Sequence, residues 1–186
     1  MLDVATGTGL VAQAALELGI VPTDLIGIDP SRGMLTENRK LRAIPLIQGR
    51  GESLPFPDAS FDFICMGYAL RHVEDLGVLF REFHRVLKPG GRVLILEISR
   101  PESRLVRSVA GFYLGRLLPA LTRWITGDAE AGRLIRFYWV TIDECVPPET
   151  IVSVLSANGL ARVERHRMGS VLNDYLGLKP AIQAGA

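Results

Sequence analysis

The sequence predicts a single α/β domain built on a doubly wound, mostly parallel sheet. Short apolar runs alternate with segments of helical periodicity, which is the pattern of parallel strands covered by helices. A length of 186 residues suits one domain with one core. Apolar residues make up 48% of the chain, a composition typical of a folded protein and not of a disordered one.

Composition also limits the class of function. The net charge is +1, whereas a strongly basic total is typical of a protein that binds nucleic acid, so we expect no such partner. Two cysteines are too few for a disulfide framework or a metal site. The longest uncharged stretch, 4–16, is too short to span a bilayer. Asp3 stands near the start without a basic leader, so a cytoplasmic location is expected.

Five strands are expected in the first hundred residues. Segments of helical spacing separate them, and the last of these has its apolar residues on one face. Proline and glycine at 88–91 are expected to stop that helix. The fifth strand is almost wholly apolar and is therefore expected to be central. The expected strands are 1–4, 25–28, 46–48, 61–66 and 92–98, and the helices end at about 18, 41 and 87.

The pattern changes after Ser99. Residues 100–126 carry five arginines and one acid, and their apolar side chains recur at helical spacing until Pro119 interrupts. A helix at 150–158 and a strand at 161–167 are expected to follow.

A glycine loop joins the first strand to the first helix. Gly7 and Gly9 allow a sharp turn and a close approach of a ligand, and the helix N-terminus adds amide donors. Asp29 ends the second strand, where a carboxylate accepts hydrogen bonds from ribose hydroxyls in nucleotide-binding sheets. The sequence therefore predicts a nucleotide-like ligand at this loop.

The loop alone leaves alternatives open. Residues 7–12 match G-x-G-x-x-A, the dinucleotide fingerprint, which indicates NAD. An NAD enzyme needs a second half-domain and a hydride-accepting site, and the downstream sequence is of a different kind. A tight turn that binds no ligand is the other alternative.

Four blocks of sequence, in order, resemble the class I S-adenosylmethionine-dependent methyltransferases. The resemblance covers residues 2 to about 101 and implies a Rossmann-like fold, S-adenosyl-L-methionine as cofactor, and methyl transfer. We accordingly divide the domain into a cofactor-binding half at 1–99, a helical cap or substrate region at 100–148, and a C-terminal helix and strands at 149–186. The four blocks are 3–9 (DVATGTG), 26–35 (IGIDPSRGML), 51–62 (GESLPFPDASFD) and 85–92 (RVLKPGGR).

Within that superfamily, the sequence resembles the ubiquinone/menaquinone C-methyltransferases, the UbiE family. Ala5 stands where most class I enzymes carry glycine, and the UbiE family shares this alanine. Leu70-Arg71, 96–101 and 127–129 match its pattern as well, whereas the similarity is loose beyond about residue 140. The resemblance implies that the acceptor is a quinol-like ring methylated at carbon.

The same resemblance implies cofactor contacts. Residues 7–9 would face the methionine part, Asp29 would bind the ribose, and Met34 would pack near the adenine. Gly51 would offer an amide to the adenine edge, and Gly67 would line the cofactor. The residues implied at the cofactor are Asp3, Ala5, Thr6, Gly7, Thr8, Gly9, Asp29, Met34, Arg50, Gly51, Glu52 and Gly67.

Three departures from the family pattern bear on cofactor binding. Arg50 occupies a position that usually accepts from the adenine amino group, yet it has no acceptor, so Glu52 or a backbone carbonyl is expected to replace it or affinity to fall. Leu10 replaces an acid that is common in the quinone enzymes. The N-terminal helices that close over the cofactor are missing before Met1, so a truncated start is expected.

Carbon methylation of a quinol requires loss of a ring hydroxyl proton, and four residues are candidates for the catalytic site. They are Tyr68, Arg71, His72 and Asp128. Arg71 resembles the family arginine near the quinol oxygen and would stabilise a phenolate, unless it caps a helix or pairs with Glu74. His72 is a candidate base or a structural residue, and Asp128 either positions substrate or caps the next helix.

Competing functions remain at this point. We expect a methyltransferase acting on a small hydrophobic acceptor, with a quinol-like, prenylated ring as the favoured substrate. O- or N-methylation of another small metabolite is the enzymic alternative, and a truncated non-catalytic cofactor-binding protein is the other. Segment 100–126 is either a core-facing cap or a basic helix that rests on anionic lipid, and a homodimer is also considered.

Overall fold

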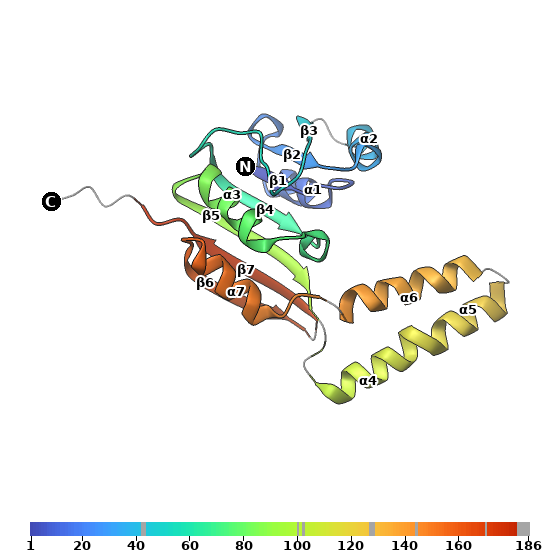
Figure 1. Cartoon of the computed structure of the whole chain (residues 1–186). Coiled ribbons are helices and arrows are strands. Elements are labelled where there is room, and N and C mark those ends of the chain that lie inside the picture. Colours follow the sequence, from blue (N-terminus) through green and yellow to red (C-terminus); the bar gives the residue numbers. More distant parts are fainter. Residues whose placement is uncertain are drawn as a thin grey trace.

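The computed structural model describes residues 1–41, 44–99, 101, 103–126, 129–143, 145–169 and 171–181. Its seven strands form one sheet in the order β3-β2-β1-β4-β5-β7-β6, drawn in Figure 1. The sheet is parallel except at β7, which runs antiparallel to both of its neighbours. The strands are β1 (Leu2–Val4), β2 (Ile26–Asp29), β3 (Leu46–Gln48), β4 (Phe61–Gly67), β5 (Leu87–Ile98), β6 (Ala161–Met168) and β7 (Leu172–Leu178).

The strand order reverses beside β1, and this reversal positions the site. β1 pairs with β2 on one side and with β4 on the other, both in parallel. The chain leaves β1 and β4 toward opposite sides of the sheet, so a crevice opens at the carboxyl ends of these strands.

Two apolar clusters form the core. Successive side chains of β3 show that the clusters lie on opposite faces of the sheet, because Ile47 packs on the larger cluster and Leu46 on the smaller one. The helix α3 (Leu76–Val86) buries one face in the larger cluster, and α7 (Pro148–Ala157) buries Ile151 and Leu155 beside it. The helix α1 (Leu10–Glu17) packs in the smaller cluster, and α2 (Arg32–Leu41) lies between β2 and β3 in the chain.

A helical hairpin projects from the end of the sheet where β5 and β7 lie (Figure 1). One arm is continuous through α4 (Arg104–Phe112), a π-helical segment η3 (Tyr113–Leu117) and α5 (Leu118–Thr126), and the other arm is α6 (Ala129–Asp143). Small residues bring the arms together, since a Cβ at Gly132 would come within 2.8 Å of the Pro119 carbonyl oxygen. None of the helices in the described part of the chain is long and apolar enough to cross a bilayer.

The predicted fold class is confirmed, and the observed strands and helices of the cofactor half differ from the expected ones by a few residues at their ends. Three details differ. The fifth strand already begins at Leu87, although it lies inside the sheet between β4 and β7 as expected. Pro119 does not break the helix, because the π turn before it accommodates the missing N–H. No strand was expected specifically at Leu172–Leu178, which is inserted between β5 and β6.

Candidate active site

A cavity of about 370 Å³ lies at the carboxyl ends of β1, β2 and β4. This volume lies within the roughly 300–1,000 Å³ that is typical of small-molecule sites. Both the glycine loop and the segments after β3 and β4 contribute to the wall. The lining residues are Val4, Ala5, Gly7, Asp29, Pro30, Ser31, Met34, Arg50, Gly51, Glu52, Met66, Gly67, Tyr68, Ala69, His72 and Val73.

The glycine loop turns through left-handed backbone conformations. Ala5, Gly7 and Gly9 have φ angles of 55°, 53° and 90°. The Gly9 amide donates to the Thr6 carbonyl at 2.8 Å, which closes the turn just before α1. Ala5 adopts a conformation that is rare for a residue with a side chain, which is the conformation that glycine provides without strain.

Asp29 connects the loop to β2. Its Oδ2 accepts from the Gly7 amide at 2.8 Å, and its Oδ1 accepts from the Ser31 amide at 2.8 Å. The side chain is only 6% exposed yet lines the cavity. Each carboxylate oxygen has a second lone pair, so the group can still accept hydrogen bonds from a ligand.

A buried polar network supports the loop from below. Thr6 Oγ1 donates to Asp3 Oδ2 at 2.6 Å, and Asn38 Nδ2 of α2 donates to the Gly7 carbonyl at 3.1 Å. Asp3 Oδ1 has no hydrogen-bond partner among the described residues. Burial raises the pKa of Asp3 to about 7, and the hydrogen bond from Thr6 opposes that rise.

The wall after β3 is built from Arg50, Gly51 and Glu52. A Cβ at Gly51 would come within 2.6 Å of Leu79 Cδ1, so the close packing of this wall on α3 requires glycine. Arg50 is exposed and its guanidinium lies 3.8 Å from the Glu74 carboxylate. Such an exposed pair contributes little to stability.

The wall after β4 carries Tyr68 and His72. Tyr68 has a φ of 57°, and its amide donates to the Leu96 carbonyl at 2.7 Å. A tyrosine in the left-handed region is strained, and such strain persists where the surrounding structure fixes the backbone, often at functional sites. The short helix η2 (Leu70–His72) then places the exposed His72 side chain at the cavity.

Arg71 does not line the cavity. Its Nη1 lies 3.3 Å from Glu97 Oε1, and Glu97 is 3% exposed at the end of β5. Glu97 also accepts from the Leu70 and Ile98 amides, while burial raises its pKa. The alternative pairing of Arg71 with Glu74 is not formed, because Glu74 pairs with Arg50 instead.

The structure thus brings most of the sequence-predicted site residues to one cavity. Four predicted cofactor residues do not line the cavity, because they belong to the glycine loop or lie beneath it. These are Asp3, Thr6, Thr8 and Gly9. Asp128 lies outside the described residues. Sequence reasoning missed Asn38 and Glu97, although a carboxylate within the apolar run of β5 was a visible signal for Glu97. In the part of the chain described here, no three His, Cys, Asp or Glu side chains are grouped as a metal ion requires.

Comparison with known proteins identifies the family. Residues 2–95 match the model of the methyltransferase domain. The ubiquinone/menaquinone biosynthesis C-methyltransferase UbiE of Saccharophagus degradans is 32% identical over 97% of this chain and 74% of its own length. The chain belongs to the UbiE methyltransferase family. The UbiE protein of a Marinomonas strain is 38% identical over 73% of this chain, a match that spans 57% of that relative.

Solved structures show the same fold for this methyltransferase. Phosphoethanolamine N-methyltransferase 2 of Haemonchus contortus, solved with S-adenosyl-L-methionine, superposes with a TM-score of 0.68 at 19% identity and covers 97% of this chain and 48% of that one. An S-adenosylmethionine-dependent methyltransferase of Mesorhizobium loti gives a TM-score of 0.65 at 18% identity, over 95% and 89% of the two chains.

The cofactor of this methyltransferase is S-adenosyl-L-methionine, and the cavity suits it. Asp29 presents a fixed carboxylate of the kind that accepts from ribose hydroxyls. A Cβ at Gly67 would come within 2.7 Å of Val11 Cγ2, so the backbone here packs closely on α1 and leaves the cavity open. The acceptor oxygens of Asp29 and the space beside Gly67 are therefore compatible with a nucleoside in this cavity.

Proposed function

We propose that this enzyme transfers a methyl group from S-adenosyl-L-methionine to a ring carbon of a small, hydrophobic quinol-like acceptor. The observation that carries the proposal is the identity of 32–34% to UbiE proteins over 97% of the chain. These relatives are named for carbon methylation in ubiquinone and menaquinone biosynthesis, and the match includes the helical hairpin as well as the cofactor half.

The cofactor, when bound, supplies an electrophilic methyl group on a sulfonium. The task of the protein is then to align the acceptor carbon and to exclude water. We assign the ribose hydroxyls to Asp29, the adenine edge to the Gly51 amide, and the adenine face to Met34, all of which line the cavity. Residues 7–9 are assigned to the methionine part.

The acceptor end of the cavity is assigned to the wall after β4. Met66, Ala69 and Val73 give this wall an apolar surface that suits a hydrophobic ring. We assign the role of base for the ring hydroxyl proton to His72, because its imidazole lines the cavity and a neutral imidazole has a ring nitrogen that can accept a proton. Tyr68 is assigned to hold the ring beside it.

Arg71 is better assigned a positioning role than direct contact with the acceptor. Its guanidinium already pairs with the buried Glu97, which in turn accepts from the Leu70 amide at 2.8 Å. The pair therefore fixes the turn that carries His72. Replacement of Arg71 would leave Glu97 buried without its ion-pair partner and would displace this turn.

Methyl transfer to two acceptors tests the proposal. The full chain is incubated with methyl-labelled S-adenosyl-L-methionine and a demethylquinol, and a matched ring blocked at the reacting carbon but free at oxygen serves as control. We expect label only in the first ring, and about a hundredfold loss with His72→Gln, as for removal of a general base. Label in the blocked ring would indicate O-methylation, and no label in either would contradict a quinol acceptor.

We also propose that the hairpin at 104–143 rests on an anionic bilayer, from which a prenylated acceptor would enter. Large apolar side chains on α4 and α5 are exposed, with Trp124 at 83% and Leu105 at 74%. Arginines are interleaved with them, as in helices that lie in a membrane interface. The arginines of the hairpin are Arg104, Arg107, Arg116, Arg123, Arg133 and Arg136.

Vesicle flotation tests this contact. We expect the chain to float with vesicles of mixed phosphatidylglycerol and phosphatidylcholine, and the variant Leu105→Ser/Trp124→Ser to remain in solution. Sedimentation without lipid tests whether a second copy of the chain covers this face instead. A concentration-dependent dimer that the same double variant abolishes would assign the face to that second copy and contradict binding to the bilayer.

A further inference from the structure

The segment from Gly51 to Asp58 forms part of the cavity wall without being part of the sheet. It begins at Gly51 and Glu52, which line the cavity, and continues past Pro55 and Pro57 toward β4. Proline has no N–H, so these positions cannot donate to a strand ladder. Within the described range 44–99, residues 54–60 belong to no helix or strand, and something else must fix their position.

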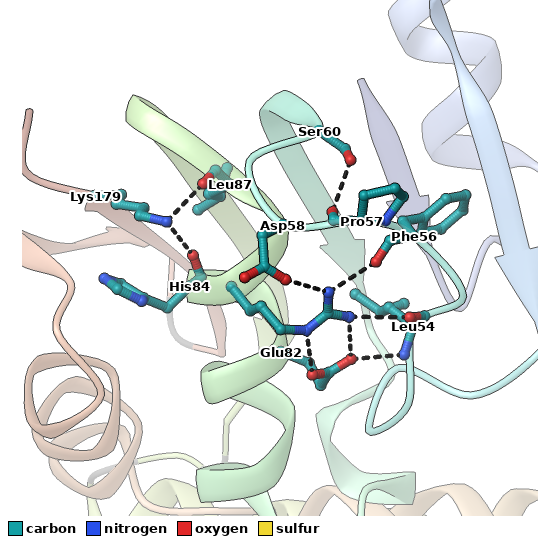
Figure 2. Close-up of polar contacts among 10 residues, drawn as sticks. Leu54, Phe56, Pro57, Asp58, Ser60, Glu82, His84, Leu87 and Lys179 are labelled. Atoms are coloured by element: carbon teal, nitrogen blue, oxygen red, sulfur yellow. Dashed lines mark hydrogen bonds and ion pairs between the residues drawn. The ribbon is translucent and has the colours of Figure 1, made fainter.

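Two side chains of α3, Glu82 and Arg85, hold this segment. Figure 2 labels Glu82 together with Leu54, Phe56 and Asp58 of the segment. Glu82 Oε2 accepts from the Leu54 amide at 2.8 Å, and Arg85 Nη2 donates to the Leu54 carbonyl at 3.0 Å. Arg85 Nη1 donates to the Phe56 carbonyl at 2.7 Å and to Asp58 Oδ1 at 2.9 Å. Both backbone groups of Leu54 are therefore satisfied by one helix turn.

The pair is itself rigid. The Arg85 guanidinium donates through Nε and Nη2 to the two Glu82 carboxylate oxygens, both at 2.8 Å. This fork geometry is the strongest form of side-chain ion pair. The Arg85 guanidinium beside Glu82 lowers the pKa of that carboxyl, so the pair stays charged at neutral pH.

The helix that carries the pair is anchored on both sides. The opposite face of α3 is completely buried through the side chains of Phe80, Phe83 and Val86. At the end of the helix, Lys179 Nζ donates to the His84 and Leu87 carbonyls at 2.7 and 2.8 Å, as Figure 2 shows. The core thus fixes the positions of Glu82 and Arg85, and the hydrogen bonds of these two side chains in turn fix the segment.

We propose that Glu82 and Arg85 are positioning residues for S-adenosyl-L-methionine: they clamp Leu54, Phe56 and Asp58 and thereby set the cavity wall at Gly51 and Glu52. Neither residue lines the cavity. Only Ser53 separates Leu54 from Glu52, so a shift at Leu54 carries into the wall. A ligand site loses much of its affinity when its groups are displaced by more than about half an ångström. The inference rests on cofactor binding alone and is independent of the identity of the acceptor.

Calorimetric titration of the full chain with S-adenosylhomocysteine tests the clamp. Arg85→Gln removes the fork and Arg85→Lys keeps only the charge, since a lysine cannot form the bidentate contacts. Lys88→Ala is the matched control, because it breaks the 2.8 Å ion pair to Asp62 at the same end of α3 without touching the segment. Amide hydrogen exchange at Leu54 is followed in the same samples.

We expect Arg85→Gln to raise the Kd of S-adenosylhomocysteine about tenfold, Arg85→Lys to raise it less, and Lys88→Ala to leave it within about twofold. Exchange at Leu54 should accelerate in the order of the affinity loss. Unchanged affinity in folded Arg85→Gln, even with a lowered Tm, would overturn the proposal. If Arg85→Gln does not fold, the Arg85→Lys variant tests the proposal instead. Wild-type affinity of Arg85→Lys for S-adenosylhomocysteine, together with faster amide exchange at Leu54, would also overturn the proposal.

Discussion

The cofactor half and the helical hairpin contain amphipathic helices of similar pattern, yet the two regions bury their apolar faces very differently. In α3, Leu79, Phe80 and Phe83 are fully buried against the sheet. In the hairpin, Phe112 and Trp124 are 59% and 83% exposed. Helical periodicity therefore predicts that a helix has an apolar face, but only a neighbouring element decides whether that face is buried.

Arginine pairs show the same contrast. Arg85 in the cofactor half makes hydrogen bonds to two carboxylates and two carbonyls and fixes a cavity wall. Arg107 in the hairpin forms a fork with Asp143 at 2.5 and 2.9 Å, which joins the two arms at their base. The first pair shapes a site, and the second holds two helices together.

The largest effect is expected for two matched phenylalanines. Phe83→Ala should lower the free energy of unfolding by about 3–5 kcal/mol, because it leaves a cavity in a closed core. Phe112→Ala should change it by no more than about 0.5 kcal/mol, because this ring is more than half exposed. Urea unfolding followed by circular dichroism measures both. An equal loss in the two variants would show that the hairpin is packed against a partner in solution.

The next effect is a dependence of stability on pH that belongs to the cofactor half. Burial raises the pKa of Asp3 from 3.8 to about 7. The folded state thus favours the protonated acid, so the contribution of Asp3 to stability is intact below pH 4 and is lost as the pH rises to about 7. Asp3→Asn, which mimics the neutral acid, should gain stability relative to wild type over that window.

Denaturant titrations of wild type and Asp3→Asn at pH 4, 5.5, 7 and 8 measure the difference. Subtraction removes the titration of the other carboxylates. A difference that is constant across these pH values would contradict a buried, neutral Asp3.

A smaller effect in free energy, but a direct one on function, is expected at Asp29. Asp29→Asn keeps the shape of the side chain but replaces one acceptor oxygen by a donor, which opposes the Gly7 or the Ser31 amide. We expect the affinity for S-adenosylhomocysteine to fall about 10- to 100-fold, as for loss of a charged hydrogen bond. Calorimetric titration measures it, and Asp24→Asn, at an exposed aspartate that precedes β2 and does not line the cavity, is the control. Equal affinities for the two variants would rule out a role for Asp29 at the ribose.

The smallest effect is expected for the ion pair at the base of the hairpin. Arg107→Ala should lower the unfolding midpoint only slightly, since this ion pair is partly exposed to water and such pairs contribute about 1 kcal/mol or less. The two arms should nevertheless separate more often, and the freed helix should unfold locally and be cut faster by chymotrypsin at the exposed Phe112 and Tyr113. Cleavage rates of Arg107→Ala and of Lys88→Ala give the comparison, and similar rates would show that Arg107 does not hold the arms together.

The cofactor half was predictable because its signals are local. The loop from Gly7 to Gly9, Asp29 at the end of β2 and the apolar runs of the strands each lie within a few residues, and the structure places them as expected. The family resemblance added the wall at Gly51 and the turn at Tyr68 and His72, which also lie at the cavity. Their individual roles in binding and catalysis stay predictions.

The fold class, the nucleotide-like loop and most of the residues that line the cavity were predictable from the sequence. Only the tertiary structure decided that Arg71 pairs with Glu97 instead of Glu74, that Asn38 supports the glycine loop, and that β7 is inserted between β5 and β6. Turns and strands follow from local backbone preferences and periodicity. Side-chain pairs and strand order depend instead on which distant segments meet, as the pairing of Arg71 with Glu97, 26 positions apart in the chain, shows.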